Sequence, residues 1–214
     1  MARARSFDPS RRTVLAAAAL MAGPAFAAPR RRIVTLLGDS ITAGLGLPAA
    51  DALPAQLQLA LSRLGAQAQV RGAGVSGDTT ADALARVDFS VQADTDLCVV
   101  ELGGNDLLQG VDPGTVRANL SAVLARLRLR RIAAVLTGMR APPRIGSAYA
   151  RAFDEAFAAA ASAGGAVLYP DLLAGVGRDP RLLQRDAIHP NAEGVRIIAA
   201  RLAPVIARAL ARGR

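Results

Sequence analysis

The chain is poor in residues that many protein classes depend on. Its 214 residues include one cysteine, one histidine, no tryptophan and no lysine, and aromatic residues make up 3%. The single Cys98 cannot form an internal disulfide, and its apolar neighbours predict a buried strand thiol. So few aromatic rings cannot stack many nucleic-acid bases, and no cluster of cysteine and histidine is present for a metal. We therefore expect neither nucleic-acid binding nor a metal centre, although the net charge is +9.

The first 27 residues have the organisation of an export signal. Arg11 and Arg12 precede an apolar stretch over residues 14–21, and small residues lead to a cleavage site after Ala27. The apolar stretch is shorter than the ~20 residues that span a bilayer. The arginine pair resembles a twin-arginine signal, with the general secretory route as the alternative. We expect a periplasmic or secreted protein in which residues 28–214 form one domain.

Apolar runs of strand length alternate with helical patterns along this domain. The predicted strands are Ile33–Leu37, Ala68–Arg71, Leu97–Leu102, Ile132–Thr137 and Ala166–Leu168, and the predicted helices are Ala52–Leu64, Thr80–Val87, Val116–Leu129, Ser147–Ala163 and Ala192–Ala211. Such alternation predicts an α/β fold, with an open parallel sheet of roughly five strands between two layers of helices. Sites in these folds lie at the carboxyl ends of the strands.

Three residues at predicted strand and helix ends have the chemistry of a serine hydrolase. Ser40 follows the first strand, and His189, the one imidazole in the chain, precedes the last helix. A serine needs a base to become nucleophilic, and the base needs an orienting group, for which Asp186 lies three residues before His189. Each residue also has a simpler use: Ser40 as a helix cap, Asp186 as a surface turn residue, and His189 as a helix-entry residue.

Two further residues are candidate donors to a developing oxyanion. Gly77 lies in a glycine-rich turn and offers a backbone N–H, and Asn105 follows a buried strand and offers its amide. The backbone N–H of Ser40 would be the third donor. The alternatives are a plain turn glycine and a loop asparagine that satisfies the backbone. Asp39 and Asp106 are expected to brace turns.

Taken together, these motifs resemble the SGNH (GDSL-type) hydrolase superfamily, whose hallmark is Ser, Gly, Asn and His in that order. The stretches that carry the resemblance are Gly38–Ser40, Gly74–Thr80, Glu101–Asp106, Met139–Pro143 and Asp186–Asn191. The chain is similar to the thioesterase I / lysophospholipase L1 / arylesterase group within it. The resemblance implies a flavodoxin-like three-layer sandwich, no cofactor, and hydrolysis of acyl esters or thioesters through an acyl-enzyme.

One departure from the family pattern is Ala187, where glycine is usual. A small side chain is tolerated there unless the backbone needs a positive φ.

The acyl-binding residues are less sharply indicated. Leu107, Leu108 and Val111 follow Asn105 and either line an acyl pocket or pack a helix. The loop from Pro142 to Tyr149, including Pro143, is a candidate for the opposite wall.

The expected partner is a small acyl ester or a lysolipid-like substrate, and the protein is expected to be a monomer. Scattered arginines allow weak association with an anionic membrane surface. Two alternatives stay open: a carbohydrate O-acetylesterase using the same site, and a non-catalytic binding module on the same fold.

Overall fold

The computed structural model describes residue 1 and residues 30–212. Apart from Met1, the predicted export signal lies outside these residues. Within the described chain, no helix combines the length and the apolar character needed to cross a bilayer.

Five parallel strands form the centre of the fold. They are β1 (Arg32–Gly38), β2 (Ala68–Gly74), β3 (Leu97–Glu101), β4 (Ala133–Thr137) and β5 (Val167–Tyr169), arranged in the order β2-β1-β3-β4-β5. Strand β1 therefore lies inside the sheet, with β2 on one side of it and β3, β4 and β5 following on the other side. The predicted parallel sheet is confirmed.

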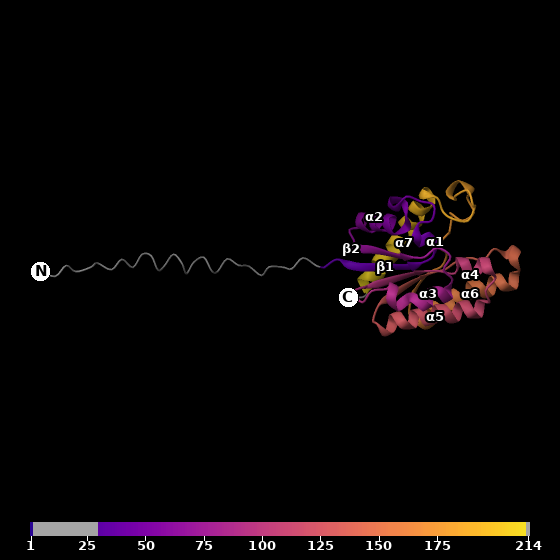
Figure 1. The fold of residues 1–214 in the computed structure, drawn as a ribbon, viewed down its shortest axis with the longest axis horizontal. Helices are drawn as coiled ribbons and strands as arrows, with labels where there is room; N and C mark the ends of the chain where they lie inside the picture. Colours follow the sequence, from indigo (N-terminus) through magenta and orange to yellow (C-terminus); the bar gives the residue numbers. More distant parts are fainter. Residues whose placement is uncertain (2–29, 213–214) are drawn as a thin grey trace. The chain divides into compact units, whose positions relative to one another are not determined.

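Helices cover both faces of the sheet, as Figure 1 shows. The helices are α1 (Ser40–Ala43), α2 (Leu53–Arg63), α3 (Thr80–Ser90), α4 (Gly104–Gln109), α5 (Pro113–Leu129), α6 (Ser147–Gly164) and α7 (Ala192–Arg212), with short 3-10 turns η3 (Ala49–Asp51), η4 (Pro143–Ile145) and η5 (Pro180–Leu182). Helices α2 and α7 pack on one face, and α3, α5 and α6 on the other (Figure 1). The three-layer architecture is confirmed.

Alternating side chains of β3 divide the core between the two faces. Leu97 and Val99 join the cluster under α2 and α7, whereas Cys98 and Val100 join the cluster under α3, α5 and α6. Cys98 is fully buried, and burial raises the pKa of its thiol to about 12. The predicted buried strand thiol is therefore confirmed.

The structure differs from the sequence prediction in two short helices and in several element ends, since α3 continues to Ser90 beyond the predicted Val87 and α5 begins at Pro113, before the predicted Val116. Helices α1 and α4 have four and six residues, too few to show a helical period. Strand β2 continues three residues beyond the predicted Arg71 to Gly74. A side chain at Gly74 would meet the backbone of Thr42 and Ala43, so this glycine permits the close approach of α1 to the sheet.

The carboxyl ends of the central strands are level with one another. Gly38 at the end of β1 pairs with Gly74 of β2 on one side and with Glu101 of β3 on the other. The residues that follow these three strands therefore emerge at one edge of the sheet.

Candidate active site

The turn after β1, residues 38–40, presents Ser40 at the first position of α1 and is called the nucleophile turn below. Asp39 caps this helix, because its Oδ1 accepts a hydrogen bond from the N–H of Ile41 at 3.0 Å. The capping function left open for Ser40 is thus performed by its neighbour. The Oγ of Ser40 instead lies 2.8 Å from Nε2 of His189, although 149 residues separate the two along the chain.

His189 is held on its other side by Asp186. The Nδ1 of His189 lies 2.6 Å from Oδ2 of Asp186, and Oδ1 of Asp186 accepts the N–H groups of Ile188 and His189. The hydrogen bond from Ile188, followed by those from His189, lowers the pKa of Asp186 to about 2. The carboxylate is therefore ionised at neutral pH, and it favours the imidazole tautomer that has a proton on Nδ1.

Asp186 and His189 belong to a tight loop over residues 184–189, called the base loop below. An antiparallel bridge between Leu183 and Pro190 closes it at its foot. Ala187, near its tip, has a φ of +58°. This is the left-handed region in which a Cβ costs on the order of 1 kcal/mol, so the departure from glycine at this position carries strain.

The nucleophile turn and the base loop differ in exposure. Ser40 is 7% exposed, whereas the side chains of His189 and Asp186 are 19% and 43% exposed.

The backbone N–H groups of Ser40 and Gly77 have no acceptor among residues 30–212, and neither do those of Ser76 and Asn105 at the same edge. Gly77 has a φ of +92°, and a Cβ built on it would meet nothing within 4 Å. Glycine is thus favoured at residue 77 by backbone conformation, and open space lies above it.

The amide of Asn105 lies at the same edge. Its Nδ2 donates to the carbonyl of Asp78 at 2.9 Å and reaches Oδ2 of Asp39 at 3.5 Å. The second distance is at the limit of a hydrogen bond, so this N–H is weakly held. Asn105 therefore connects the nucleophile turn to the turn that contains Gly77.

Asp106 has the bracing function expected of it. Its carboxylate accepts the backbone N–H of Thr80 at 2.9 Å and the hydroxyl of Thr80 at 2.6 Å, which joins α4 to the start of α3. Asp39 braces its own turn through Ile41, as described above.

The candidate acyl-binding residues differ in their burial. Leu107 and Val111 are partly buried and pack against the core under α5 and α6, the packing function that the sequence left open. Leu108 is 64% exposed. Pro142 is partly buried, and Pro143 begins η4.

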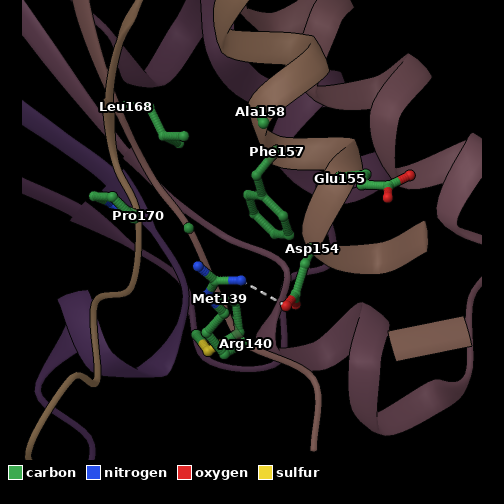
Figure 2. Close-up of a pocket in the computed structure, with 9 residues that line it drawn as sticks. Met139, Arg140, Asp154, Glu155, Phe157, Ala158, Leu168 and Pro170 are labelled. Atoms are coloured by element: carbon green, nitrogen blue, oxygen red, sulfur yellow. Dashed lines mark hydrogen bonds and ion pairs between the residues drawn. The ribbon is translucent and has the colours of Figure 1, made fainter. Parts of the chain in front are cut away.

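A separate cavity of about 220 Å³ lies between α6 and the ends of β4 and β5. Figure 2 shows Met139 and Phe157 lining it and an ion pair between Arg140 and Asp154. Met139 and Phe157 also flank the glycines before Asn105: a Cβ at Gly104 would lie 3.6 Å from Met139, and one at Gly103 would lie 2.7 Å from Phe157. The cavity thus shares walls with the asparagine turn, but neither Ser40 nor His189 lines it.

Sequence reasoning assigned no function to Glu101, which lies beneath the nucleophile turn. It is fully buried, and its Oε2 accepts the hydroxyl of Thr42 at 2.8 Å and the N–H of Asp39 at 3.4 Å. Burial, with the nearby charge of Asp39, raises the pKa of Glu101 well above its usual range. The Oε1 atom has no described partner. A glutamate that ends an otherwise apolar strand was the available signal.

Arg86 on α3 is a second contact that sequence reasoning did not assign. Its guanidinium pairs with Asp78 at 2.6 Å and donates to the carbonyls of Ala73 and Gly38 at 2.9 Å. It therefore binds the ends of β1 and β2 to the turn that contains Gly77. Among residues 30–212, no three His, Cys, Asp or Glu side chains gather in a way that could hold a metal ion.

Comparison with known proteins gives consistent matches across most of the chain. Residues 36–197 match the GDSL-like Lipase/Acylhydrolase family. The chain is 37% identical over 156 residues to esterase TesA of Pseudomonas aeruginosa, covering 72% of this chain and 78% of that protein. It is 31% identical over 175 residues to thioesterase 1/protease 1/lysophospholipase L1 of Escherichia coli, covering 81% and 83%.

A solved structure agrees with these matches. The crystal structure of AlinE4, described as an SGNH-hydrolase family esterase, has a TM-score of 0.71 and 42% identity, covering 86% of this chain and 99% of that one.

Proposed function

The chain belongs to the GDSL-like lipase/acylhydrolase family and is a hydrolase of ester bonds, and on that premise we propose that Ser40, His189 and Asp186 are its catalytic triad. The membership confirms the resemblance drawn from the sequence motifs. The observation that supports the triad most directly is the run of contacts from Ser40 Oγ to His189 Nε2 at 2.8 Å and from His189 Nδ1 to Asp186 at 2.6 Å. Both distances are those of hydrogen bonds.

In the proposed reaction, His189 takes the proton of Ser40 as the serine oxygen attacks the acyl carbonyl. The ionised Asp186 stabilises the imidazolium that forms. His189 then protonates the leaving alcohol or thiol, which leaves an acyl group on Ser40. Water, activated by His189, attacks this acyl-enzyme and releases the acid.

The proposed oxyanion donors are the N–H groups of Ser40 and Gly77 and the amide of Asn105. The two backbone groups are supported by their lack of an acceptor among the described residues. For Asn105, we assign the N–H that is weakly held by Asp39 at 3.5 Å, because the other N–H is committed to Asp78. Donors placed in advance of reaction stabilise charge without having to reorganise.

The proposed substrates are lipid-like or aryl acyl esters and thioesters. This proposal is supported by the names of the relatives, an esterase and a thioesterase/lysophospholipase. We also propose that the protein is exported, which rests on the first 27 residues of the sequence alone.

The test is hydrolysis of p-nitrophenyl esters from acetyl to palmitoyl by the protein beginning at Ala28, with Ser40→Ala as the control. A rate that peaks at medium or long chains and disappears in Ser40→Ala is the expected result. A peak at acetyl would favour removal of small acyl groups, and a folded protein that neither hydrolyses any ester nor reacts with a fluorophosphonate would refute the proposal.

A further inference from the structure

The proposed triad is assembled from two segments far apart in the chain. Ser40 follows β1, whereas His189 lies in the base loop before α7. Because a displacement of 1 Å in such a pair can cost about 10²-fold in rate, something must hold the two segments in register. The hydrogen bond between Ser40 and His189 cannot do so alone, since the proposed reaction breaks it during each turnover.

Gln184 makes a second connection between the same two segments. Its Nε2 donates to the carbonyl of Leu45, just beyond α1, at 2.8 Å and to the carbonyl of Pro190, next to His189, at 3.0 Å. A primary amide has two N–H donors, so these two contacts use both. The side chain of Gln184 thus bridges the nucleophile segment and the base loop.

The backbone of Gln184 closes the base loop on itself. Its N–H donates to the carbonyl of His189 at 2.7 Å, and its own carbonyl accepts the N–H of Ala187 at 3.0 Å. The residue that reaches across to Leu45 is therefore also fixed directly to His189.

The partner segment leaves room for this side chain. Gly46 has a φ of +75°, and a Cβ at this position would lie 2.3 Å from Oε1 of Gln184. Gln184 also borders the same small space as Ser40 and His189. The glycine and the glutamine therefore fit each other at the site.

We propose that Gln184 is a positioning residue, which sets His189 Nε2 against Ser40 Oγ by tying the base loop to the carbonyl of Leu45. The inference rests on the proposed function of Ser40 and His189. None of the described hydrogen bonds of Gln184 reaches the side chain of Ser40 or His189, so its effect would pass through the loop.

The decisive variants are Gln184→Met, which keeps the length and removes both donors, and Gln184→Lys, which restores N–H donors on a flexible chain. A matched control is Gln58→Met. Gln58 also makes two backbone contacts, to the carbonyl of Ala68 and from the N–H of Val70, but it does so at the outer edge of β2. Each methionine variant therefore loses two hydrogen bonds to the backbone, and Gln58→Met also loses the contact of Nε2 with the hydroxyl of Ser62 at 3.3 Å.

We expect Gln184→Met to lower kcat by about 10-fold to 10²-fold with KM nearly unchanged. Gln184→Lys should recover part of kcat, and Gln58→Met should keep it. If kcat falls no further in Gln184→Met than in Gln58→Met, or if lysine recovers none of it, the inference is overturned.

A spectroscopic measurement separates this inference from the proposed function. Because His189 is the one histidine of the chain, the imidazole signals of an untagged protein need no assignment. The low-field Nδ1–H resonance should be sharp in the wild type and in Gln58→Met, and broadened or lost in Gln184→Met. An unchanged resonance in Gln184→Met would overturn the inference even if the wild type proved inactive, whereas an inactive, unlabelled wild type would defeat the proposed function alone.

Discussion

The two halves of the site are held in different ways. The nucleophile turn lies over a buried polar layer in which Glu101 binds Thr42 and the backbone of Asp39. The base loop is largely exposed and is held by hydrogen bonds of its own backbone and of Asp186 and Gln184. Burial links the stability of the first half to that of the whole fold, whereas the second half can open locally. Substitutions below Ser40 should thus lower stability, whereas substitutions of the base-loop side chains that form or hold the proposed triad should lower activity with little effect on stability.

The most severe test of this comparison is His189→Ala. We expect the rate of ester hydrolysis to fall by more than about 10³-fold, because no second imidazole can replace the base. The free energy of unfolding should change by no more than about 1 kcal/mol, since the loop is exposed. Hydrolysis kinetics and urea unfolding of the same sample measure both. Substantial remaining activity would remove His189 from the mechanism.

Asn105→Ala tests the contact between the nucleophile turn and the turn that contains Gly77. Loss of one oxyanion donor should lower kcat by about 10²-fold to 10³-fold. The carbonyl of Asp78 also loses its donor, so a small loss of stability should accompany the kinetic effect. A decrease of less than about threefold in kcat would be far below the loss of one donor and would place Asn105 outside the oxyanion hole.

Glu101→Gln tests the buried half of the site through the pH dependence of stability. The folded-state pKa of Glu101 is raised above the 4.5 of an unperturbed glutamate. A raised pKa means that the unfolded chain releases this proton first, so the wild type loses stability as pH rises from about 4.5 towards the folded-state pKa. Glutamine does not titrate. Urea titrations at several pH values in this window should therefore show the wild type losing stability relative to Glu101→Gln as pH rises.

A matched variant completes this prediction. Glu101→Leu removes the acceptor for Thr42 and Asp39 and should cost about 1–3 kcal/mol for each donor left unpaired. If the difference in unfolding free energy between the wild type and Glu101→Gln is the same at every pH, Glu101 does not have a raised pKa in the folded state.

The smallest expected effect is that of Ala187→Gly in the base loop. Glycine removes the strain of a φ of +58°, but it also loosens the unfolded chain, so the net gain should be less than about 1 kcal/mol with kcat unchanged. Ala93→Gly, at an exposed position without a positive φ, is the control and should destabilise. If both variants destabilise equally, residue 187 is not strained.

Much of the fold was predictable because long periodic segments dominate it. The five strands and five longest helices follow from apolar patterns, the position of Ser40 follows from the rule that sites lie at strand ends, and His189 was placed just before the last helix. Helices α1 and α4 were missed because they are shorter than two turns. The glycine-rich end of β2 was missed because the apolar pattern stops at Arg71.

The supporting contacts could not be predicted for a different reason. Glu101 lies beneath the nucleophile turn because Gly38 pairs with it across the sheet, and strand register is not readable from one segment. Gln184 reaches Leu45 across 139 residues of chain. The positive φ of Ala187 could not be predicted, because no local sequence pattern fixes the backbone angles of an alanine. The sequence indicated only that alanine would be unfavourable there if the backbone needed a positive φ.

The separation between Ser40 and His189 has a consequence for biosynthesis. A nascent chain would carry the proposed nucleophile early, but the proposed base follows 149 residues later, and α7 must then pack against the face of the sheet that contains β1. An unfolded chain, in which the proposed nucleophile and base are apart, would therefore be inert towards esters. Recovery of hydrolysis during refolding would therefore report the docking of α7 against the sheet that contains β1.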